Sequence, residues 1–170
     1  RKMYVTGACG ALYDGTSPDG TVYDPDLIQK VHQSYGRPYQ LPQSTAHNET
    51  CANIGNMLFN WRMLQSTGDA KYADVMERSL YNGALAGISL QGDKFFYVNP
   101  LESDGKHHRQ EWYGCACCPS QISRFLPSIG NYIYGTSPDA LYINLYLGNE
   151  ADISLNGNGI KVSQTTEYPW

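Results

Sequence analysis

The 170-residue sequence lacks the features that mark nucleic-acid-binding and membrane proteins. Its 12 basic residues are outnumbered by 16 acidic ones, and the net charge of -4 provides no basic surface for phosphate groups. No apolar run approaches the ~20 residues that a membrane-spanning helix needs. The opening residues, RKMYVTG, contain neither a methionine at position 1 nor an apolar secretory signal. We expect a globular protein with no nucleic-acid partner and no membrane partner, cut at both ends from a longer chain.

The five cysteines are odd in number and too unevenly spaced for a disulfide framework. Cys115, Cys117 and Cys118 crowd into four positions, while Cys9 and Cys51 stand far away in the sequence. Small secreted domains pair even numbers of well-separated cysteines, and a bridge between two adjacent cysteines would be strained. Clustered thiols are more typical of a metal site or of covalent chemistry.

The central part of the chain has helical periodicity. Apolar residues recur at helical spacing over 50–66, and Gly68 ends that run. A second helix is predicted over 69–86, which makes an antiparallel pair with the first. A β-hairpin over 88–98 follows, with its turn at Gln91-Gly92-Asp93. A third helix is predicted to start at Pro119 and to bend at Pro127.

Beyond Gly135 the period of the apolar residues changes from 3.6 to 2, which predicts strands. They are expected near 141–146, 151–155 and 159–166, with a domain boundary near 135–139. Three helices cannot cover one another's apolar faces well, and about three strands are too few for a closed sandwich. The fold class is therefore α+β, and each half is expected to belong to something larger.

Two short motifs hold residues that bind metals. One is Glu49-Thr50-Cys51 at the start of the first helix, and the other is Cys115-Ala116-Cys117-Cys118-Pro119 at the start of the third. Zinc takes four ligands from Cys, His and carboxylates, and a helix N-terminus favours thiolate anions. The spacing matches no zinc-finger pattern. From spacing alone, zinc binding, buried free cysteines and a redox pair all remain open.

The sequence resembles glycoside hydrolase family 127, the β-L-arabinofuranosidases, formerly an uncharacterised domain family. The resemblance rests on segments that span nearly the whole chain: YVTGACGALYDG, YQLP, HNETCANIGN, KYADVMERSLYNGALAGISLQGDKFFYVNPL and YGCACCPSQISRFLPSIGNYIY. The family has an (α/α)6 barrel followed by β-sandwich domains. The resemblance implies that residues 1–136 are the C-terminal part of the catalytic barrel and that residues 137–170 begin a β-sandwich.

The resemblance also implies a Zn²⁺ cofactor and a retaining mechanism. Carried onto this sequence, the zinc ligands are Glu49, Cys51, Cys117 and Cys118. Cys117 is implied to be the nucleophile, which forms a thioglycosyl intermediate in place of the usual carboxylate ester. Cys9 and Cys115 receive no role and are interpreted as small buried residues.

One residue departs from the family pattern. The family's general acid/base is a glutamate nine residues before the proline of the YxLP motif, and here that position is Gln33. An amide cannot exchange a proton as a carboxyl does. The acid is then another residue such as Asp14, Asp24 or His32, or it lies outside these residues, or hydrolysis has been lost. We take Asp14 as the candidate acid/base.

Four further residues are candidates for substrate binding: His47, Tyr97, Trp112 and Tyr113. Aromatic faces stack on the C–H groups of sugars, but each of these rings could equally pack around the cysteines. His47 could orient a ligand, contact sugar or serve a structural role.

The leading hypothesis is a bacterial zinc-thiolate glycosidase whose carbohydrate substrate is a plant β-L-arabinofuranoside or a related, acidic or branched, pentofuranoside. The isolated 170 residues are expected to be inactive. The alternatives are a non-catalytic carbohydrate-binding relative with structural zinc and a plain zinc-stabilised module. A homodimer through the β-sandwich region is a further expectation for the longer protein. The sequence does not choose between periplasm and cytoplasm.

Overall fold

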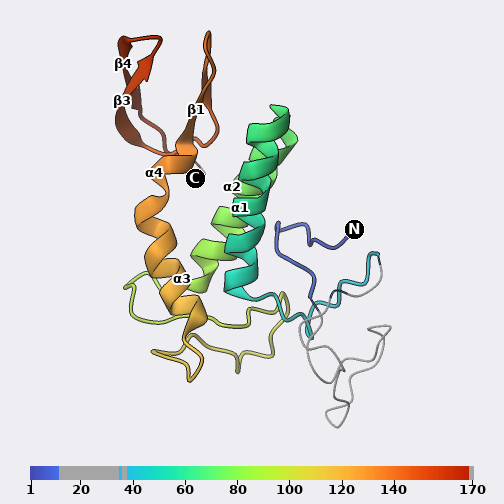
Figure 1. The fold of residues 1–170 in the computed structure, drawn as a ribbon. Coiled ribbons are helices and arrows are strands. Elements are labelled where there is room, and N and C mark those ends of the chain that lie inside the picture. The colour runs from blue at the N-terminus through green and yellow to red at the C-terminus, as the bar shows by residue number, and fades with distance from the viewer. Residues whose placement is uncertain (12–34, 36–37, 169–170) are drawn as a thin grey trace.

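The computed structural model describes residues 1–11, 35 and 38–168. Its helical part contains α1 (Thr50–Thr67), α2 (Lys71–Ser79), a π-helical turn η1 (Leu80–Ala84) and a 3-10 turn η2 (Leu85–Gly87). A long connection leads to α3 (Cys117–Phe125), the 3-10 turn η3 (Leu126–Ser128) and α4 (Gly130–Ile133). Figure 1 shows these helices side by side, with the strands at one end of them.

The antiparallel pair of α1 and α2 confirms the helices predicted from periodicity. Gly68 ends α1 in the left-handed conformation, with φ of 68°, and its backbone N–H donates to the carbonyl of Leu64 at 2.8 Å. Glycine suits this position because it has no Cβ to clash there. The predicted bend at Pro127 is also present, as the 3-10 turn η3 between α3 and α4.

The segment after α2 departs from the prediction. The second helix does not continue as an α-helix to residue 86 but loosens into η1 and η2. The predicted hairpin over 88–98 is reduced to a single bridge between Ile88 and Phe95. Phe95 also exchanges both of its backbone hydrogen bonds with Gln110, at 2.8 and 2.9 Å. Phe95 therefore pairs with two segments, and local periodicity does not reveal its pairing with the distant Gln110.

Two separate antiparallel pairs of strands follow the helices. Strand β1 (Tyr134–Thr136) pairs with β2 (Leu141–Ile143), and β3 (Asn149–Leu155) pairs with β4 (Asn158–Gln164). The tight turn of the second pair has positive φ at Asn156 and Gly157, 51° and 78°, as a type I′ hairpin turn requires. The strands confirm the change of period, although β2 is shorter than predicted.

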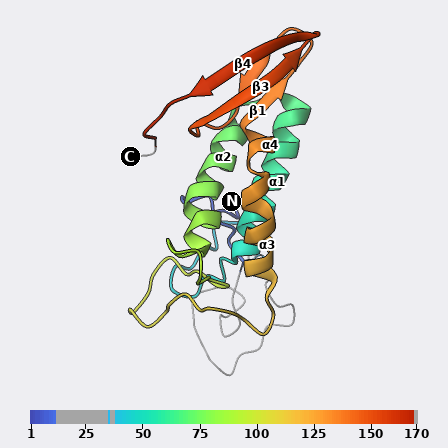
Figure 2. The ribbon, with the colours of Figure 1, turned by 90° about the vertical axis from the view of Figure 1, so that its left-hand side faces the viewer.

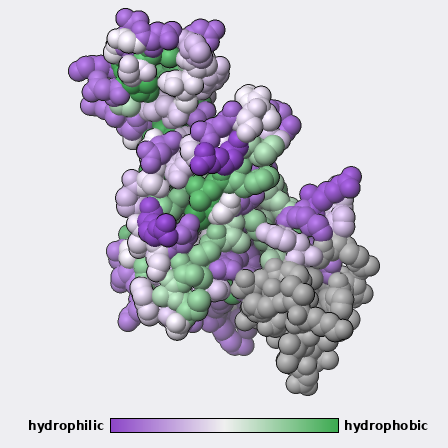
Figure 3. All heavy atoms as spheres, in the orientation of Figure 1, coloured by the Kyte–Doolittle hydropathy of each residue, from purple (hydrophilic) through white to green (hydrophobic). Residues whose placement is uncertain are grey.

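The helices and these small sheets make an α+β arrangement. The main core lies between the helices; its members are Ile54, Met57, Met76, Leu80, Ala84, Phe95, Ile122, Phe125 and Leu145. Figure 3 shows apolar side chains reaching the surface over the helical part of the face seen in Figure 1. Within the described part of the chain, no helix is long and apolar enough to cross a bilayer.

Candidate metal and catalytic site

The first half of the site is held by the beginning of α1. Glu49 immediately precedes the helix in an extended conformation and pairs with Val98 as an isolated bridge. Thr50 donates its backbone N–H to the carbonyl of Tyr97 at 3.1 Å and its hydroxyl to the carbonyl of Phe96 at 2.8 Å. Cys51 follows in the first turn. The segment 96–98 thus fixes the position from which Glu49 and Cys51 project.

The second half of the site is held by the beginning of α3, whose first two residues are Cys117 and Cys118. The two views of the ribbon show α1 and α3 beginning at the same end of the molecule, opposite the strands (Figure 2). The thiol of Cys118 is fully buried, while Cys117 and Cys51 are half-buried. The two motifs therefore lie at helix starts, as predicted, and these two helix N-termini converge.

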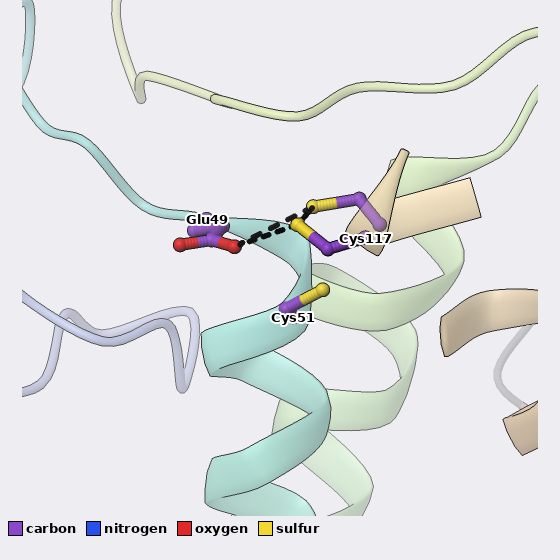
Figure 4. A group of neighbouring side chains, drawn as sticks. Glu49, Cys51 and Cys117 are labelled. Carbon is purple, nitrogen blue, oxygen red and sulfur yellow. Dashed lines mark hydrogen bonds between the residues drawn. The ribbon is translucent and has the colours of Figure 1, made fainter. Parts of the chain in front are cut away.

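Four potential ligand atoms meet between these helices. One carboxylate oxygen of Glu49 and the sulfurs of Cys51, Cys117 and Cys118 all lie within 4.8 Å of one another. The thiols of Cys117 and Cys118 donate to Oε1 of Glu49 at 3.4 and 3.7 Å. Figure 4 shows the Glu49 carboxylate and the Cys51 thiol directed toward the Cys117 thiol.

Three of the distances among these atoms fit a tetrahedral metal ion with sulfur and oxygen ligands. A Zn–S bond of about 2.3 Å places two sulfurs about 3.8 Å apart on a tetrahedron, and a sulfur and an oxygen about 3.5 Å apart. The sulfurs of Cys117 and Cys118 are 3.8 Å apart, and the two Glu49 contacts bracket the second value. The donor set, three thiols and one carboxylate, is one that zinc prefers.

The metal-free cluster holds its protons tightly. Burial raises the pKa of Cys117 to about 11, although a hydrogen bond from Tyr97 acts in the opposite direction. Hydrogen bonding with Cys51, together with burial, raises the pKa of Cys118. By contrast, the contact with His47, whose Nε2 lies 3.5 Å from Oε2 of Glu49, lowers the pKa of Glu49. The carboxylate is therefore ionised, whereas the two adjacent thiols need a cation beside them to ionise near neutral pH.

A buried chain of amides, which the sequence analysis did not single out, supports the segment before α1. Asn48 lies in the left-handed region, with φ of 38°, and donates to the carbonyl of Asn99 at 2.5 Å. Asn53 donates to the side-chain oxygen of Asn48 at 2.9 Å and accepts from the backbone of Cys9 at 3.0 Å. The signal in the sequence is the pair of asparagines that flanks Glu49 and Cys51.

The structure places the substrate-binding candidates at different depths. His47 is buried beside Glu49, and the ring of Tyr97 meets it edge-on at 6.1 Å. Tyr113 packs against Tyr97 and donates its hydroxyl to the carbonyl of Phe95 at 2.8 Å. Trp112 is 62% exposed. The candidate acid/base Asp14 lies outside the described residues, as do Asp24, His32 and Gln33.

Comparison with known protein families gives a match over residues 1–131. The matching family is described as "Beta-L-arabinofuranosidase, GH127 catalytic domain". The chain belongs to this family. The resemblance stated from the ETC and CACCP motifs is therefore confirmed, and the four converging residues are those of these two motifs.

Individual relatives extend over the whole chain. The non-reducing end β-L-arabinofuranosidase of Bifidobacterium longum subsp. longum is 36% identical over 184 residues, which is 100% of this chain and 25% of the relative. The solved GH127 β-arabinofuranosidase BT3674 is 45% identical, with a TM-score of 0.87, and this chain covers 24% of it. The GH127 β-L-arabinofuranosidase Ara127N-Se of Geobacillus stearothermophilus T6 is 42% identical, with a TM-score of 0.76 and 26% covered. The chain thus spans about a quarter of the length of these relatives.

Proposed function

We propose that the protein is a retaining glycoside hydrolase of the β-L-arabinofuranosidase type, with a zinc-bound cysteine as its nucleophile. The observation that carries this proposal is the convergence of Glu49, Cys51, Cys117 and Cys118 within 4.8 Å, in a chain of the GH127 family. The names of the relatives, β-L-arabinofuranosidases, support the reaction class.

The proposed ligands are the Glu49 carboxylate and the three thiols. The chemistry that a zinc ion supplies when bound is to keep the coordinating sulfurs ionised near neutral pH. Cys117 is the proposed nucleophile because it is the less buried of the two adjacent cysteines and begins α3. Cys118, which is fully buried, is restricted to binding the metal.

The proposed reaction runs in two displacements. The Cys117 sulfur attacks the anomeric carbon, so that a carbon–sulfur bond forms as the glycosidic carbon–oxygen bond breaks. The departing oxygen takes a proton from a general acid. Water then attacks the same carbon, the carbon–sulfur bond breaks, and the proton of the water passes to the same residue acting as base. Two inversions give net retention at the anomeric carbon.

Tyr97 supports the sulfur in both displacements. Its hydroxyl hydrogen-bonds to Cys117 and favours the ionised form of that thiol. Tyr113 holds Tyr97 in place, because its hydroxyl accepts the backbone N–H of Tyr97 at 3.2 Å and donates to Phe95. With Trp112 exposed beside them, these aromatic residues are the proposed sugar-facing wall.

The remaining assignments are proposals of the same kind. Asp14 is the proposed acid/base in place of Gln33. The helices are proposed to complete an (α/α)6 barrel, and residues 137–170, which contain β2, β3 and β4, to begin a β-sandwich. The proposed substrates are β-L-arabinofuranosides or related pentofuranosides of plant polysaccharides, including acidic or branched ones, because a changed acid implies a changed leaving group or sugar.

The test uses the full-length protein, meaning these residues together with any chain that precedes and follows them. Metal content is measured on the native protein and on Cys51→Ser, and hydrolysis of aryl β-L-arabinofuranosides is measured on native protein and Cys117→Ala. We expect about one zinc per chain, loss of zinc in Cys51→Ser, and loss of turnover in Cys117→Ala. Turnover that survives Cys117→Ala refutes the nucleophile. Zinc and sugar binding without any turnover would favour the alternative of a non-catalytic carbohydrate-binding protein, which the glutamine at position 33 supports.

A further inference from the structure

The two oxygens of the Glu49 carboxylate have different neighbours. Oε1 accepts the thiols of Cys117 and Cys118 at 3.4 and 3.7 Å. Oε2 lies 3.5 Å from Nε2 of His47. The imidazole therefore contacts the oxygen that is turned away from the sulfurs.

A carboxylate at the start of a helix can rotate about its side-chain bonds. The two oxygens of a carboxylate are chemically equivalent, so a neighbour can fix only the plane of the group and its place in the cluster. With His47 beside one oxygen, the other is directed at the sulfurs, and the side chain is kept from turning out of the cluster. Groups that hold a ligand in this way raise the affinity of a site, since less rotational freedom is lost when the metal binds.

His47 is itself held firmly. Its side chain is 2% exposed, and its ring meets the ring of Tyr97 edge-on at an interplanar angle of 75°. Its backbone N–H donates to the carbonyl of Ala11 at 3.2 Å, and Asn48, anchored by the amide chain, follows it directly. A ring so buried offers almost no surface to a sugar, so it acts on the reaction through Glu49.

We propose that His47 is a positioning residue, whose imidazole fixes the Glu49 carboxylate in the orientation that binds the metal. This inference rests on the proposed function, because it concerns the same metal site. It differs from a substrate contact, since its effect falls on metal affinity before any sugar is present.

The test compares two substitutions in the full-length protein. His47→Phe keeps an aromatic ring against Tyr97 but has no hydrogen-bond donor, whereas His47→Gln keeps a donor without the ring. Zinc affinity is measured by competition with a chromophoric chelator, and Co²⁺ absorption reports the ligand set. We expect His47→Phe to lose about 10–100-fold in zinc affinity and to change the Co²⁺ spectrum, as substitutions behind a metal ligand typically do. His47→Gln should restore most of the affinity.

The matched control is Asn60→Leu, which removes a buried polar group from α1. Asn60 bonds to Asn56 at 2.8 Å, about three turns from Glu49, so its loss should leave zinc affinity unchanged. Equal affinity in the native protein and His47→Phe would overturn the inference, as would a raised KM with unchanged affinity. If His47→Phe does not fold, His47→Gln decides, and a loss beyond tenfold in that variant overturns the inference. A native protein that binds no zinc would instead overturn the proposed function.

Discussion

At the scale of single residues, protons would compete at this site with the proposed metal ion. Burial raises the pKa of Cys117 to about 11, and hydrogen bonding with Cys51 and burial raise that of Cys118 further. Glu49 is different, because its contact with His47 lowers its pKa and keeps it ionised. The cost of binding a cation here is therefore the removal of thiol protons.

Metal affinity should consequently rise with pH. Both adjacent thiols are protonated below their raised pKa values, so at least two protons leave when the metal binds near neutrality. We expect the apparent zinc affinity to rise about a hundredfold per pH unit between pH 6 and 8. Calorimetry in buffers of different ionisation enthalpy counts the released protons. Release of fewer than one proton would show that the two thiols are not the ligands.

The hydroxyl of Tyr97 should matter for turnover and not for metal content. Tyr97→Phe removes the hydrogen bond to the Cys117 sulfur but keeps the ring between His47 and Tyr113. Hydrogen bonds to charged groups contribute about 1.5–3 kcal/mol, so kcat/KM should fall about 10–100-fold. Steady-state kinetics with an aryl pentofuranoside measures the change. Tyr132→Phe, whose ring packs against Trp61, is the control, and an equal loss in both variants would contradict the assignment.

The individual site residues also show how much of the site can be predicted from the sequence alone. Spacing placed Cys51 and Cys117 at two helix starts, but it left zinc, free thiols and a redox pair open. The ligand set came from the family resemblance, and the structure brings those four residues together. The sequence offered orienting a ligand as one of three roles for His47 but could not choose among them. The direction in which a residue points just before a helix depends here on the extended pairing of Glu49 with Val98.

At the scale of elements, two glycines let the segment after α2 approach the beginning of α1. A Cβ on Gly83 would lie 2.7 Å from Cβ of Asn53, and one on Gly87 would lie 2.5 Å from Cγ2 of Thr50. Both contacts are shorter than real Cβ atoms tolerate. The close approach fixes Thr50, and with it the neighbouring proposed ligands Glu49 and Cys51.

Gly87→Ala should therefore damage both stability and the site. The methyl group must displace Thr50, and overpacking of this kind costs about 1–3 kcal/mol. We expect a lower thermal midpoint and reduced zinc content in the full-length protein, measured by calorimetry and metal analysis.

Gly55→Ala provides the matched comparison for Gly87→Ala. Nothing lies within 4 Å of a Cβ at Gly55, which is in the middle of α1, so alanine there should stabilise the helix by about 0.5–1 kcal/mol. Unchanged zinc content in Gly87→Ala would contradict the coupling between η2 and the ligands.

Elements differ in how well the sequence predicts them. The helix α1, the break at Pro127 and the turn at Asn156-Gly157 are local events, governed by side-chain spacing, proline and left-handed residues. The change from α-helix to π-helix at η1 is not determined by the neighbouring sequence alone, because Gly83 in this turn packs closely against Asn53 of another helix. The same holds for Phe95, whose bridge to Gln110 comes from a distant loop.

At the scale of the whole molecule, the ligands join parts of the chain that are far apart in sequence. Glu49 and Cys117 are 68 positions apart, and they bring the beginnings of α1 and α3 together at one end of the helices. A metal ion bound there, as proposed, would act as a cross-link between helices of the same core. Its binding free energy would then add to the stability of the helical part.

Removal of the metal should lower the thermal midpoint of the full-length protein. An ion present at about 100 times its dissociation constant contributes about 2.7 kcal/mol, which chelation would remove. Scanning calorimetry before and after dialysis against a chelator measures the shift, and added zinc should reverse it. A Cys51→Ser variant, which lacks one ligand, should show a much smaller shift. An equal shift in both proteins would place the stabilising ion elsewhere.

The central claim is that Glu49, Cys51, Cys117 and Cys118 together bind one zinc ion, and X-ray absorption at the zinc edge of the full-length protein tests it most directly. The account predicts three sulfur neighbours at about 2.3 Å and one oxygen neighbour at about 2.0–2.2 Å. In Cys117→Ser, one of the three sulfurs should be replaced by a lighter atom. A shell of nitrogen and oxygen alone, or a sulfur count unchanged in Cys117→Ser, would contradict the account.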